Sequence, residues 1–299
     1  MVYTEIKKKN RKKYFYRVLS VRNGSKIKKK RIYLGVDLDK NNLIDKEKQA
    51  DKELMLLSTL LNEEEKKELE KIKKGYARQS KVNLENRYES FVSLFTYDST
   101  NIEGNTLTLQ ETAQLLFENI TPRKSLREIN EVVNHKNAFD FILNNKKEIS
   151  KELILQIHKL VVQNTLKPEL ENQIGKYRTL QVYIRGTEWF PPKPEEVSRE
   201  MASLLSWYSK NKKILHPLTL AAYFHSAFET IHPFADGNGR VGRLLMNLIL
   251  RRNKYPMINI PNKKKHIYYK ALEESQLKGN LRNLVKFLFD LLKEEKIKF

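Results

Sequence analysis

The sequence predicts a mainly α fold, in which a helical bundle carries one short β-hairpin and a small β module at its N-terminus. Apolar residues recur at helical spacing over most of the 299 residues, and the runs 218–231 and 241–252 have the apolar character of buried helices. Strand-like patterns occur at residues 12–34 and 177–192. The chain has no internal repeat and no linker rich in Gly, Ser or Pro. These observations favour one large helical domain with a β appendage.

The β module is predicted over residues 1–42. Residues 12–34 indicate two strands joined at Asn23-Gly24, a dipeptide that favours a tight hairpin turn. An isolated hairpin is only marginally stable in water, so we expect a third strand or packing against the main body.

The net charge of +21 is unevenly distributed, because residues 1–31 hold thirteen Lys or Arg and a single acidic residue, Glu5. A basic segment of this kind attracts nucleic acid or another acidic surface, so one interpretation gives residues 1–40 a nucleic-acid partner. Lysine is also abundant at 73–81 and 262–266. A general lysine-rich composition that aids solubility is therefore the alternative interpretation.

Residues 43–84 are predicted as a highly charged helical connector, with a homodimer contact through this segment as one expectation. The main domain is predicted over 85–299. Thr108 and Glu111 form a capping-box pattern that starts one of its helices. Helices are expected at 85–103, 108–118, 125–146, 150–165, 195–211, 217–231, 240–252, 265–275 and 281–295.

Several classes of protein are excluded by composition. The chain has no cysteine, which excludes disulfides, thiol catalysis and cysteine-based zinc sites. It has no apolar run of the roughly 18–20 residues that a membrane helix needs. The N-terminus lacks a signal-peptide pattern, so we expect a cytoplasmic protein with no membrane partner.

The most informative segment is residues 232–243, HPFADGNGRVGR, between the two buried-helix patterns. Pro233 cannot continue a helix, so residues 234–239 are expected to form a tight loop. Gly237 and Gly239 allow positive backbone angles and close approach of a ligand. Backbone N–H groups of the loop, together with the N-terminus of the following helix, can hold an anion.

The charged residues of this segment suit a polyphosphate. Arg240 and Arg243 lie three apart on one face of the second helix, and Asn238 adds amide donors. Asp236 beside phosphates indicates a bridging cation, and Mg²⁺ binds through such carboxylates. His232, as a neutral imidazole near its ordinary pKa, can take a proton from an attacking hydroxyl. Each residue alone is compatible with an ordinary turn or helix end, whereas the whole set indicates a site.

The segment HPFADGNGRVGR resembles the Fic family signature, HxFx(D/E)GNGRxxR, with no departure. The likeness covers roughly residues 85–290, and GKYRTLQVYIRGTEWFPP at 175–192 resembles the flap hairpin of that family. The resemblance implies a Fic-type bundle and transfer of AMP from ATP to a Tyr, Thr or Ser hydroxyl of a target protein, with Mg²⁺ present and pyrophosphate released.

The resemblance also assigns roles to individual residues. His232 is implied as the catalytic base, Asp236 as the Mg²⁺ ligand, and residues 179–182 as the flap that docks the target by main-chain pairing. The nucleotide-binding set is Phe234, Gly237, Asn238, Gly239, Arg240 and Arg243, and the flap set is Thr179, Leu180, Gln181 and Val182.

A second motif lies near the start of the main domain, where Ser99, Glu103 and Gly104 fit (S/T)xxxE(G/N). The motif is similar to the inhibitory motif of many Fic proteins, and its position corresponds to an N-terminal inhibitory helix. A carboxylate at Glu103 can pair with Arg243 and occupy the place of the γ-phosphate. Gly104 also suits the end of a helix.

Three alternatives to AMP transfer stay open: removal of AMP, with water activated at Glu103; phosphate transfer, as in the DOC-like kinases; and a nucleic-acid-binding regulator dominated by the N-terminal module. The glycines of the loop disfavour the kinase. The spacing of His225, Glu229 and His232 invites a metal site, but Pro233 turns the chain and no third ligand follows by spacing.

Overall fold

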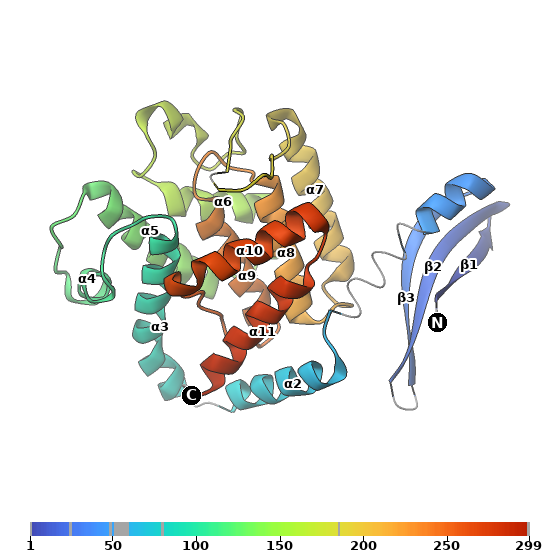
Figure 1. Ribbon diagram of the computed structural model, residues 1–299, viewed down its shortest axis with the longest axis horizontal. Helices are drawn as coiled ribbons and strands as arrows, with labels where there is room; N and C mark the ends of the chain where they lie inside the picture. Colours follow the sequence, from blue (N-terminus) through green and yellow to red (C-terminus); the bar gives the residue numbers. More distant parts are fainter. Residues whose placement is uncertain are drawn as a thin grey trace. The chain divides into compact units, whose positions relative to one another are not determined.

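The computed structural model describes residues 2–23, 26–47, 50, 60–78, 81–184 and 186–297. The chain divides into two compact units, 1–62 and 63–299, which are drawn in Figure 1. The division falls inside segment 43–84, which the sequence predicts as a connector. Among the described residues, none of the helices combines the length and apolar character that a membrane crossing requires.

The first unit contains a three-stranded antiparallel sheet in the order β1-β2-β3 (Figure 1). The strands are β1 (Val2–Lys9), β2 (Lys12–Asn23) and β3 (Lys26–Val36). Strand β1 supplies the third strand that the hairpin was expected to need, but its position was not predicted because VYTEIKKK has few apolar residues. Gly24 of the predicted turn lies outside the described residues.

One face of this sheet is covered by the helical residues 40–47 and 50. Phe15, Leu34 and Ala50 form a small buried cluster beneath that helix. Glu47 reaches back to the strands, where its carboxylate lies 3.4 Å from Arg17 and also accepts a hydrogen bond from Thr4. The helix therefore supplies the apolar cover that the sheet needs on this face.

The second unit is helical and surrounds helices α8 and α9, which lie near its centre (Figure 1). Its elements are α2 (Glu63–Ala77), α3 (Lys81–Ile102), α4 (Leu109–Ala113), η1 (Gln114–Glu118), α5 (Leu126–Asn144), α6 (Lys151–Val162), η2 (Pro168–Gln173), α7 (Pro194–Asn211), α8 (Pro217–Ile231), α9 (Asn238–Arg252), η3 (Asn262–Lys264), α10 (Lys265–Lys278) and α11 (Arg282–Ile297). The predicted mainly α fold is confirmed.

Local sequence signals set several helix starts. Thr108 accepts a hydrogen bond from the Glu111 N–H, and the Glu111 side chain accepts one from the Thr108 N–H, which completes the predicted capping box. Ser125 and Glu128 form a second capping box at the start of α5. Pro217 occupies the first turn of α8, where a missing N–H costs no helical hydrogen bond.

Helix α9 is buried from Asn238 onward on most of its surface, charged residues included. Asn247, in the middle of α9, donates to the Ile258 carbonyl at 2.9 Å and accepts from the Ile258 N–H at 2.7 Å. The buried helix is thus anchored by the Asn247 hydrogen bonds as well as by apolar packing. Both contribute to the position of its N-terminus along the helix axis.

The hairpin predicted over 177–192 is not present, because the described residues of this segment form no strand. Side chains hold this loop instead. Arg178 donates to the carbonyls of Leu180 and Pro192, at 3.0 and 2.5 Å. Trp189 donates from its indole to the Thr230 carbonyl at 2.9 Å. Strand-like alternation therefore arises here from a loop whose alternate side chains are anchored inward.

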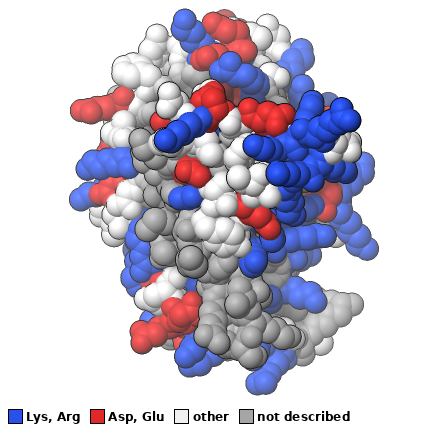
Figure 2. Space-filling model, turned by 90° about the vertical axis from the view of Figure 1, so that its right-hand side faces the viewer, with Lys and Arg blue, Asp and Glu red and all other residues white. Residues whose placement is uncertain are grey.

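Charge is conspicuous on the surface. In the view of Figure 2, Lys and Arg side chains gather in one dense region and several smaller ones, with Asp and Glu side chains between them. This distribution agrees with the net charge of +21.

Candidate active site

The predicted loop joins α8 to α9 and starts at His232, which has left-handed backbone angles of φ 50° and ψ 61°. Such angles are costly for a residue with a Cβ, and they persist only where the surroundings enforce them. Arg178 is part of that enforcement. Its Nε donates to the His232 carbonyl at 2.9 Å, and its backbone N–H donates to the Pro233 carbonyl at 2.9 Å. This role of Arg178 was not predicted, because its partners lie far from it along the chain.

The His232 side chain is 22% exposed, and burial lowers its pKa to about 4. The Glu229 carbonyl and the charges of Glu103 and Asp236 act to raise this pKa, but their combined effect is smaller than that of burial. This pKa is lower than the ordinary value expected from the sequence. At neutral pH the imidazole is therefore uncharged and able to accept a proton.

Asn238 and Phe234 hold the loop closed. Asn238 accepts from the Phe234 N–H at 2.9 Å and donates to the Phe234 carbonyl at 2.8 Å. The Phe234 ring is buried and stacks on His158, with the ring centroids 3.7 Å apart. The Asn238 amide is therefore occupied inside the loop, and the Phe234 ring is packed in the core.

His158 is a further site residue that was not predicted from the sequence. Its Nδ1 accepts from the Gly175 N–H at 3.1 Å, so the proton lies on Nε2, which donates to the Asp236 carbonyl at 3.1 Å. Burial lowers the pKa of His158 to about 4, which keeps the ring neutral and preserves this tautomer. A lone histidine in an apolar helix carries no sequence signal of this anchoring role.

The two loop glycines are required by contacts as well as by conformation. Gly237 has φ 84°, and a Cβ there would lie 2.7 Å from a Val162 methyl group. A Cβ at Gly239 would collide with the carboxylate of Glu103. The Glu103 side chain therefore lies directly against the backbone at the start of α9, where a helix N-terminus favours an anion.

Arg243 and the predicted inhibitory motif meet, as expected from the sequence. Arg243 is buried, donates from Nε to the Ser99 hydroxyl at 2.9 Å, and donates from Nη2 to the Ser99 carbonyl at 2.7 Å. Nη2 also forms an ion pair with Glu103 Oε1 at 2.8 Å. Burial acts to lower the pKa of Arg243, but the charge of Glu103, its hydrogen bond to Arg243 and the neighbouring Tyr268 and Tyr269 together raise that pKa. Gly104 follows the helix with φ +102°.

Arg240 is paired differently, although it lies one turn away. Its Nη2 donates to Asp236 Oδ1 at 3.1 Å, and its Nη1 lies 3.8 Å from Glu131 Oε1. Arg240 is buried, and within the described residues its Nε and Nη1 have no hydrogen-bond partner. The guanidinium therefore helps to hold the loop through Asp236.

Asp236 is the candidate Mg²⁺ ligand, and its side chain is 36% exposed. Oδ1 is occupied by the Gly237 N–H at 2.5 Å and by Arg240, whereas Oδ2 lies 3.7 Å from Arg127. The described residues contain no cluster of three or more metal-binding side chains. One partly exposed carboxylate is compatible with how Mg²⁺ is usually held in proteins, where phosphates and water supply the other ligands.

A cluster of buried polar groups lies behind His232. Glu229 Oε2 is 3.9 Å from His232 Nδ1, and Glu229 Oε1 is 4.0 Å from His225 Nδ1. Burial raises the pKa of Glu229 to about 8, and Arg243 only partly offsets this. His225 contacts the Tyr268 hydroxyl at 2.6 Å through its other ring nitrogen. At neutral pH this cluster is therefore mainly uncharged.

The predicted flap residues lie beside Arg178. Thr179 donates its backbone N–H to Gln173 and accepts from the same side chain, both at 3.1 Å. Arg178 also holds the Leu180 carbonyl, which places this segment next to His232. Gln181 donates to the Val182 carbonyl at 3.2 Å, and both residues are half-buried in a segment without strand structure.

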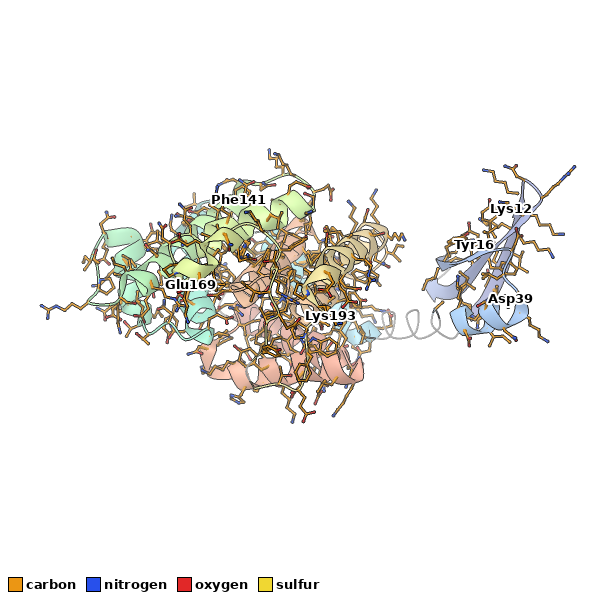
Figure 3. All side chains as sticks on the ribbon, turned by 90° about the horizontal axis from the view of Figure 1, so that it is seen from above. Lys12, Tyr16, Asp39, Phe141, Glu169 and Lys193 are labelled. Carbon is orange, nitrogen blue, oxygen red and sulfur yellow. The ribbon has the colours of Figure 1, made fainter. Side chains whose placement is uncertain are left out.

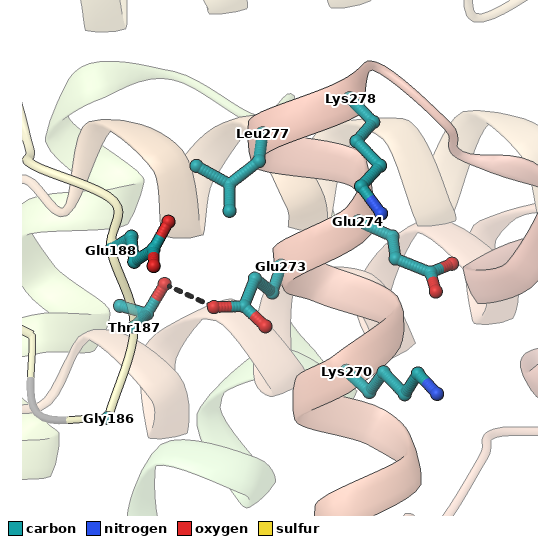
Figure 4. A pocket seen from close by; sticks show the side chains of 8 residues that line it. All are labelled: Gly186, Thr187, Glu188, Lys270, Glu273, Glu274, Leu277 and Lys278. Atoms are coloured by element: carbon teal, nitrogen blue, oxygen red, sulfur yellow. Dashed lines mark hydrogen bonds between the residues drawn. The ribbon is translucent and has the colours of Figure 1, made fainter.

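A pocket of about 640 Å³ lies between the far part of this loop and α10 (Figure 4). Thr187 bridges it by donating to Glu273 at 3.1 Å. None of the site residues predicted from the sequence lines this pocket. Its lining consists of Gly186, Thr187, Glu188, Lys270, Glu273, Glu274, Leu277 and Lys278.

Comparison with known proteins agrees with the signature. Residues 148–250 match the family model described as Fic/DOC family. The chain is 35% identical over 198 residues to the protein adenylyltransferase Fic of Nematostella vectensis, which is 64% of this chain and 45% of that protein. It is 37% identical over 202 residues to the protein adenylyltransferase fic-1 of Caenorhabditis briggsae, which is 65% of this chain and 38% of that protein. The chain thus spans less than half the length of these curated relatives.

Two solved structures are similar over most of the chain. Fic-1 (residues 134–508) of C. elegans has a TM-score of 0.69 at 28% identity, covering 87% of this chain and 76% of that one. A Fic domain containing signaling protein from Bacteroides thetaiotaomicron has a TM-score of 0.67 at 28% identity, covering 76% of this chain and 93% of that one.

Proposed function

The chain belongs to the Fic/DOC family, and on that premise we propose that it is a protein adenylyltransferase. It moves AMP from ATP to a Tyr, Thr or Ser hydroxyl of a target protein and releases pyrophosphate. The observation that carries this proposal is the segment from His232 to Arg243. A neutral imidazole stands at one end, a buried guanidinium at the other, and glycine backbone lies between them.

His232 acts as the general base. Its Nδ1 is buried on the side of Glu229, so Nε2 is the nitrogen left to meet a substrate hydroxyl. The hydroxyl proton passes to Nε2 while its oxygen bonds to the α-phosphorus. The bond from the α-phosphorus to the oxygen that bridges to the β-phosphate breaks, and pyrophosphate leaves with that electron pair.

The phosphate chain is held by the loop and the start of α9. Gly237 and Gly239 present backbone close to the ligand, and the helix N-terminus favours the negative charge. The Arg240 guanidinium is held beside the loop by Asp236, which supports a role toward the phosphates. Asp236 would hold Mg²⁺, which neutralises charge on the departing pyrophosphate.

Glu103 keeps the enzyme inactive in this arrangement. Its carboxylate is 34% exposed, forms an ion pair with Arg243, and lies against the Gly239 backbone. It therefore fills two positions that an anionic ligand would use, one at the guanidinium and one at the start of α9. ATP then has to displace this carboxylate before its γ-phosphate can reach Arg243, or else it binds in an unproductive pose. Ser99, in the last turns of α3 just before Glu103, also accepts hydrogen bonds from Arg243 and so aligns the inhibitory contact.

The target segment docks along residues 179–182. This segment has no strand partner within the described residues, and it is tied to the His232 carbonyl through Arg178. An extended target strand can pair with its main chain, which aligns the target hydroxyl with little demand on the target's sequence.

The test is label transfer from ATP to protein. The Glu103→Gly variant should incorporate label from α-labelled ATP into itself or added protein, and γ-labelled ATP should leave none. Label from the γ-position only would instead show a kinase. No incorporation from either position, with ATP binding intact, would contradict nucleotidyl transfer.

Removal of AMP is the second candidate, because the partly exposed Glu103 carboxylate at the loop can also orient a water molecule. A target that already carries AMP should then lose it with the wild-type chain and keep it with Glu103→Gly. Transfer to the unmodified target by wild-type enzyme, without any removal, decides for the first candidate.

A further inference from the structure

One face of the N-terminal sheet is lined with tyrosines and basic residues. Pairing places Lys7 opposite Tyr14 and Tyr16 opposite Tyr33, and directly paired residues share a face. Arg31 and Lys29 fall on the same face, opposite Val18 and Ser20. We call this the tyrosine–lysine face, and it includes Tyr3, Glu5, Lys7, Tyr14, Tyr16, Lys29, Arg31 and Tyr33.

The rings on this face form a continuous aromatic strip. Tyr33 is 52% exposed, and its ring centroid lies 5.4 Å from that of Tyr16 and 6.4 Å from that of Tyr14. Lysine ammonium groups lie over rings of the same face, with Lys7 Nζ 5.5 Å from the Tyr16 ring and Lys29 Nζ 5.8 Å from the Tyr3 ring. Apolar ring surface and positive charge therefore alternate.

The other face of the sheet is covered by the helix over 40–47 and 50, so it is not free to bind a partner. Figure 3 shows Lys12 and Tyr16 on the strands and Asp39 at the start of that helix. The only acidic residue in the sequence from 1 to 36 is Glu5, and it forms an ion pair with Arg31 at 2.6 Å. In the described part of this unit, the face away from the helix thus carries the exposed Tyr33 ring and the half-buried Tyr14 and Tyr16 rings among basic side chains.

We propose that the tyrosine–lysine face binds single-stranded nucleic acid, with bases stacked on the tyrosine rings and phosphates held by the lysines. Any polyanion can form ion pairs with the lysines. Only a polyanion with accessible planar bases can also stack on the tyrosine rings. In a duplex the bases stack on each other and their faces are covered. In a single strand the base faces are accessible, so they can stack on rings of a sheet surface. This activity is separate from nucleotide transfer and does not depend on it.

Fluorescence anisotropy with the full chain tests the proposal, using labelled oligo(dT) and oligo(U) of about 20 nucleotides and a duplex of equal length. Tyr16→Ser with Tyr33→Ser should weaken single-strand binding about 10-fold or more, since each stacked base contributes about 1–3 kcal/mol. Lys7→Gln with Lys29→Gln should weaken binding as well. The slope of the logarithm of affinity against the logarithm of salt concentration should fall by about 0.7 for each phosphate that is no longer neutralised.

The matched control lies on the opposite face of the same strands. Lys8 pairs with Lys13, and both are exposed, so Lys8→Gln with Lys13→Gln removes the same charge from the same module. This pair should change binding less than about 3-fold, because these lysines do not face the bound strand. Far-UV circular dichroism checks folding, and Tyr16→Phe with Tyr33→Phe, which keeps the rings, should bind as the wild type does.

Several outcomes overturn the proposal. They are equal loss of affinity in the control pair and the face pair, unchanged binding when the two rings are removed from a folded chain, and tighter binding of the duplex than of either single strand. Binding to phosphatidylserine vesicles in preference to oligonucleotides would assign the charge to a membrane surface instead.

Discussion

The two ends of the segment from His232 to Arg243 are both buried, but the groups at one end are uncharged and the group at the other end is charged. At the first end, His232, His225 and Glu229 are mainly uncharged at neutral pH, because burial lowers the pKa of the imidazoles and raises that of the carboxyl. At the other end, Arg243 stays charged, because Glu103 supplies a counter-charge at 2.8 Å. One short stretch of chain therefore holds both a neutral base and a permanent cation.

The difference shows how burial sorts groups by role. A base must be uncharged before it can accept a proton, and desolvation alone achieves this for a histidine. A cation that is to hold phosphate must keep its charge, and a buried cation needs an anion beside it at all times. Glu103 is that anion in this structure, and under the proposed function one contact would both inhibit the enzyme and stabilise its empty site.

The largest effect is expected at the uncharged end. His232→Asn removes the base but keeps a residue type that tolerates the left-handed backbone at this position. We expect AMP transfer to fall by about 100-fold to 10,000-fold, the usual contribution of a general base. Label incorporation by the Glu103→Gly chain, with and without His232→Asn, measures it.

The exposed His266 provides the control, since His266→Ala should leave transfer unchanged. Transfer retained within about 3-fold in His232→Asn would move the base role elsewhere.

The next effect is expected at the charged end. Glu103→Gly frees Arg243 for the γ-phosphate, and a charge-assisted contact of about 1.5–3 kcal/mol should tighten ATP binding about 10-fold to 100-fold. The same variant without ATP should be less stable by about 1–3 kcal/mol, because Arg243 is left buried without its partner. Calorimetric titration and thermal unfolding with and without ATP measure both.

Glu118 is exposed and lies away from this contact, so Glu118→Gln should change neither quantity. If Glu103→Gly leaves the ATP affinity unchanged, the ion pair between Glu103 and Arg243 does not inhibit ATP binding.

A smaller effect concerns the residue that fastens the loop to the flap. Arg178→Ala leaves the carbonyls of His232, Leu180 and Pro192 without their donor. We expect about 1–3 kcal/mol lower stability, and a transfer rate reduced in addition because the His232 backbone is no longer fixed. Chemical denaturation gives the first, and single-turnover transfer by folded protein gives the second.

Arg178→Lys should restore part of the stability and little of the rate, because an ammonium cannot donate in three fixed directions. Full recovery of the rate by lysine would show that the fork geometry of Arg178 is not needed.

The smallest effect should appear as a change in pH dependence. The Glu229 carboxyl has an ordinary pKa of 4.5 and a folded pKa of about 8, so the native state loses stability as pH rises from about 4.5 to about 8. Glu229→Gln removes this loss and should be relatively more stable at pH 8 by about 1–2 kcal/mol. Unfolding free energies measured between pH 5 and pH 8 test it.

Both chains should still lose stability as pH falls from about 6.5 to about 4, because the pKa of His158 and of His232 is lowered to about 4 in the folded state. If the free energy of unfolding has the same slope against pH above pH 5 in Glu229→Gln and the wild type, the Glu229 carboxyl is solvated and its pKa is not raised.

Local patterns were enough to predict a large part of the molecule. The helices near the site, the loop after His232, and the pairing of Glu103 with Arg243 all follow from spacing, turn residues and a specific motif. The helices and the loop depend on neighbours within a few residues, which are visible in the chain itself. The pairing of Glu103 with Arg243 was implied by the resemblance to the Fic inhibitory motif.

The tertiary structure decided what depends on distant neighbours. It assigned Asn238 and Phe234 to holding the loop, made Arg178 and His158 the anchors of its backbone, and added strand β1. It also set the pKa of His232 and of Glu229, since burial arises only when helices from across the sequence enclose a group. Sequence names the chemical groups, and packing determines their charge and their partners.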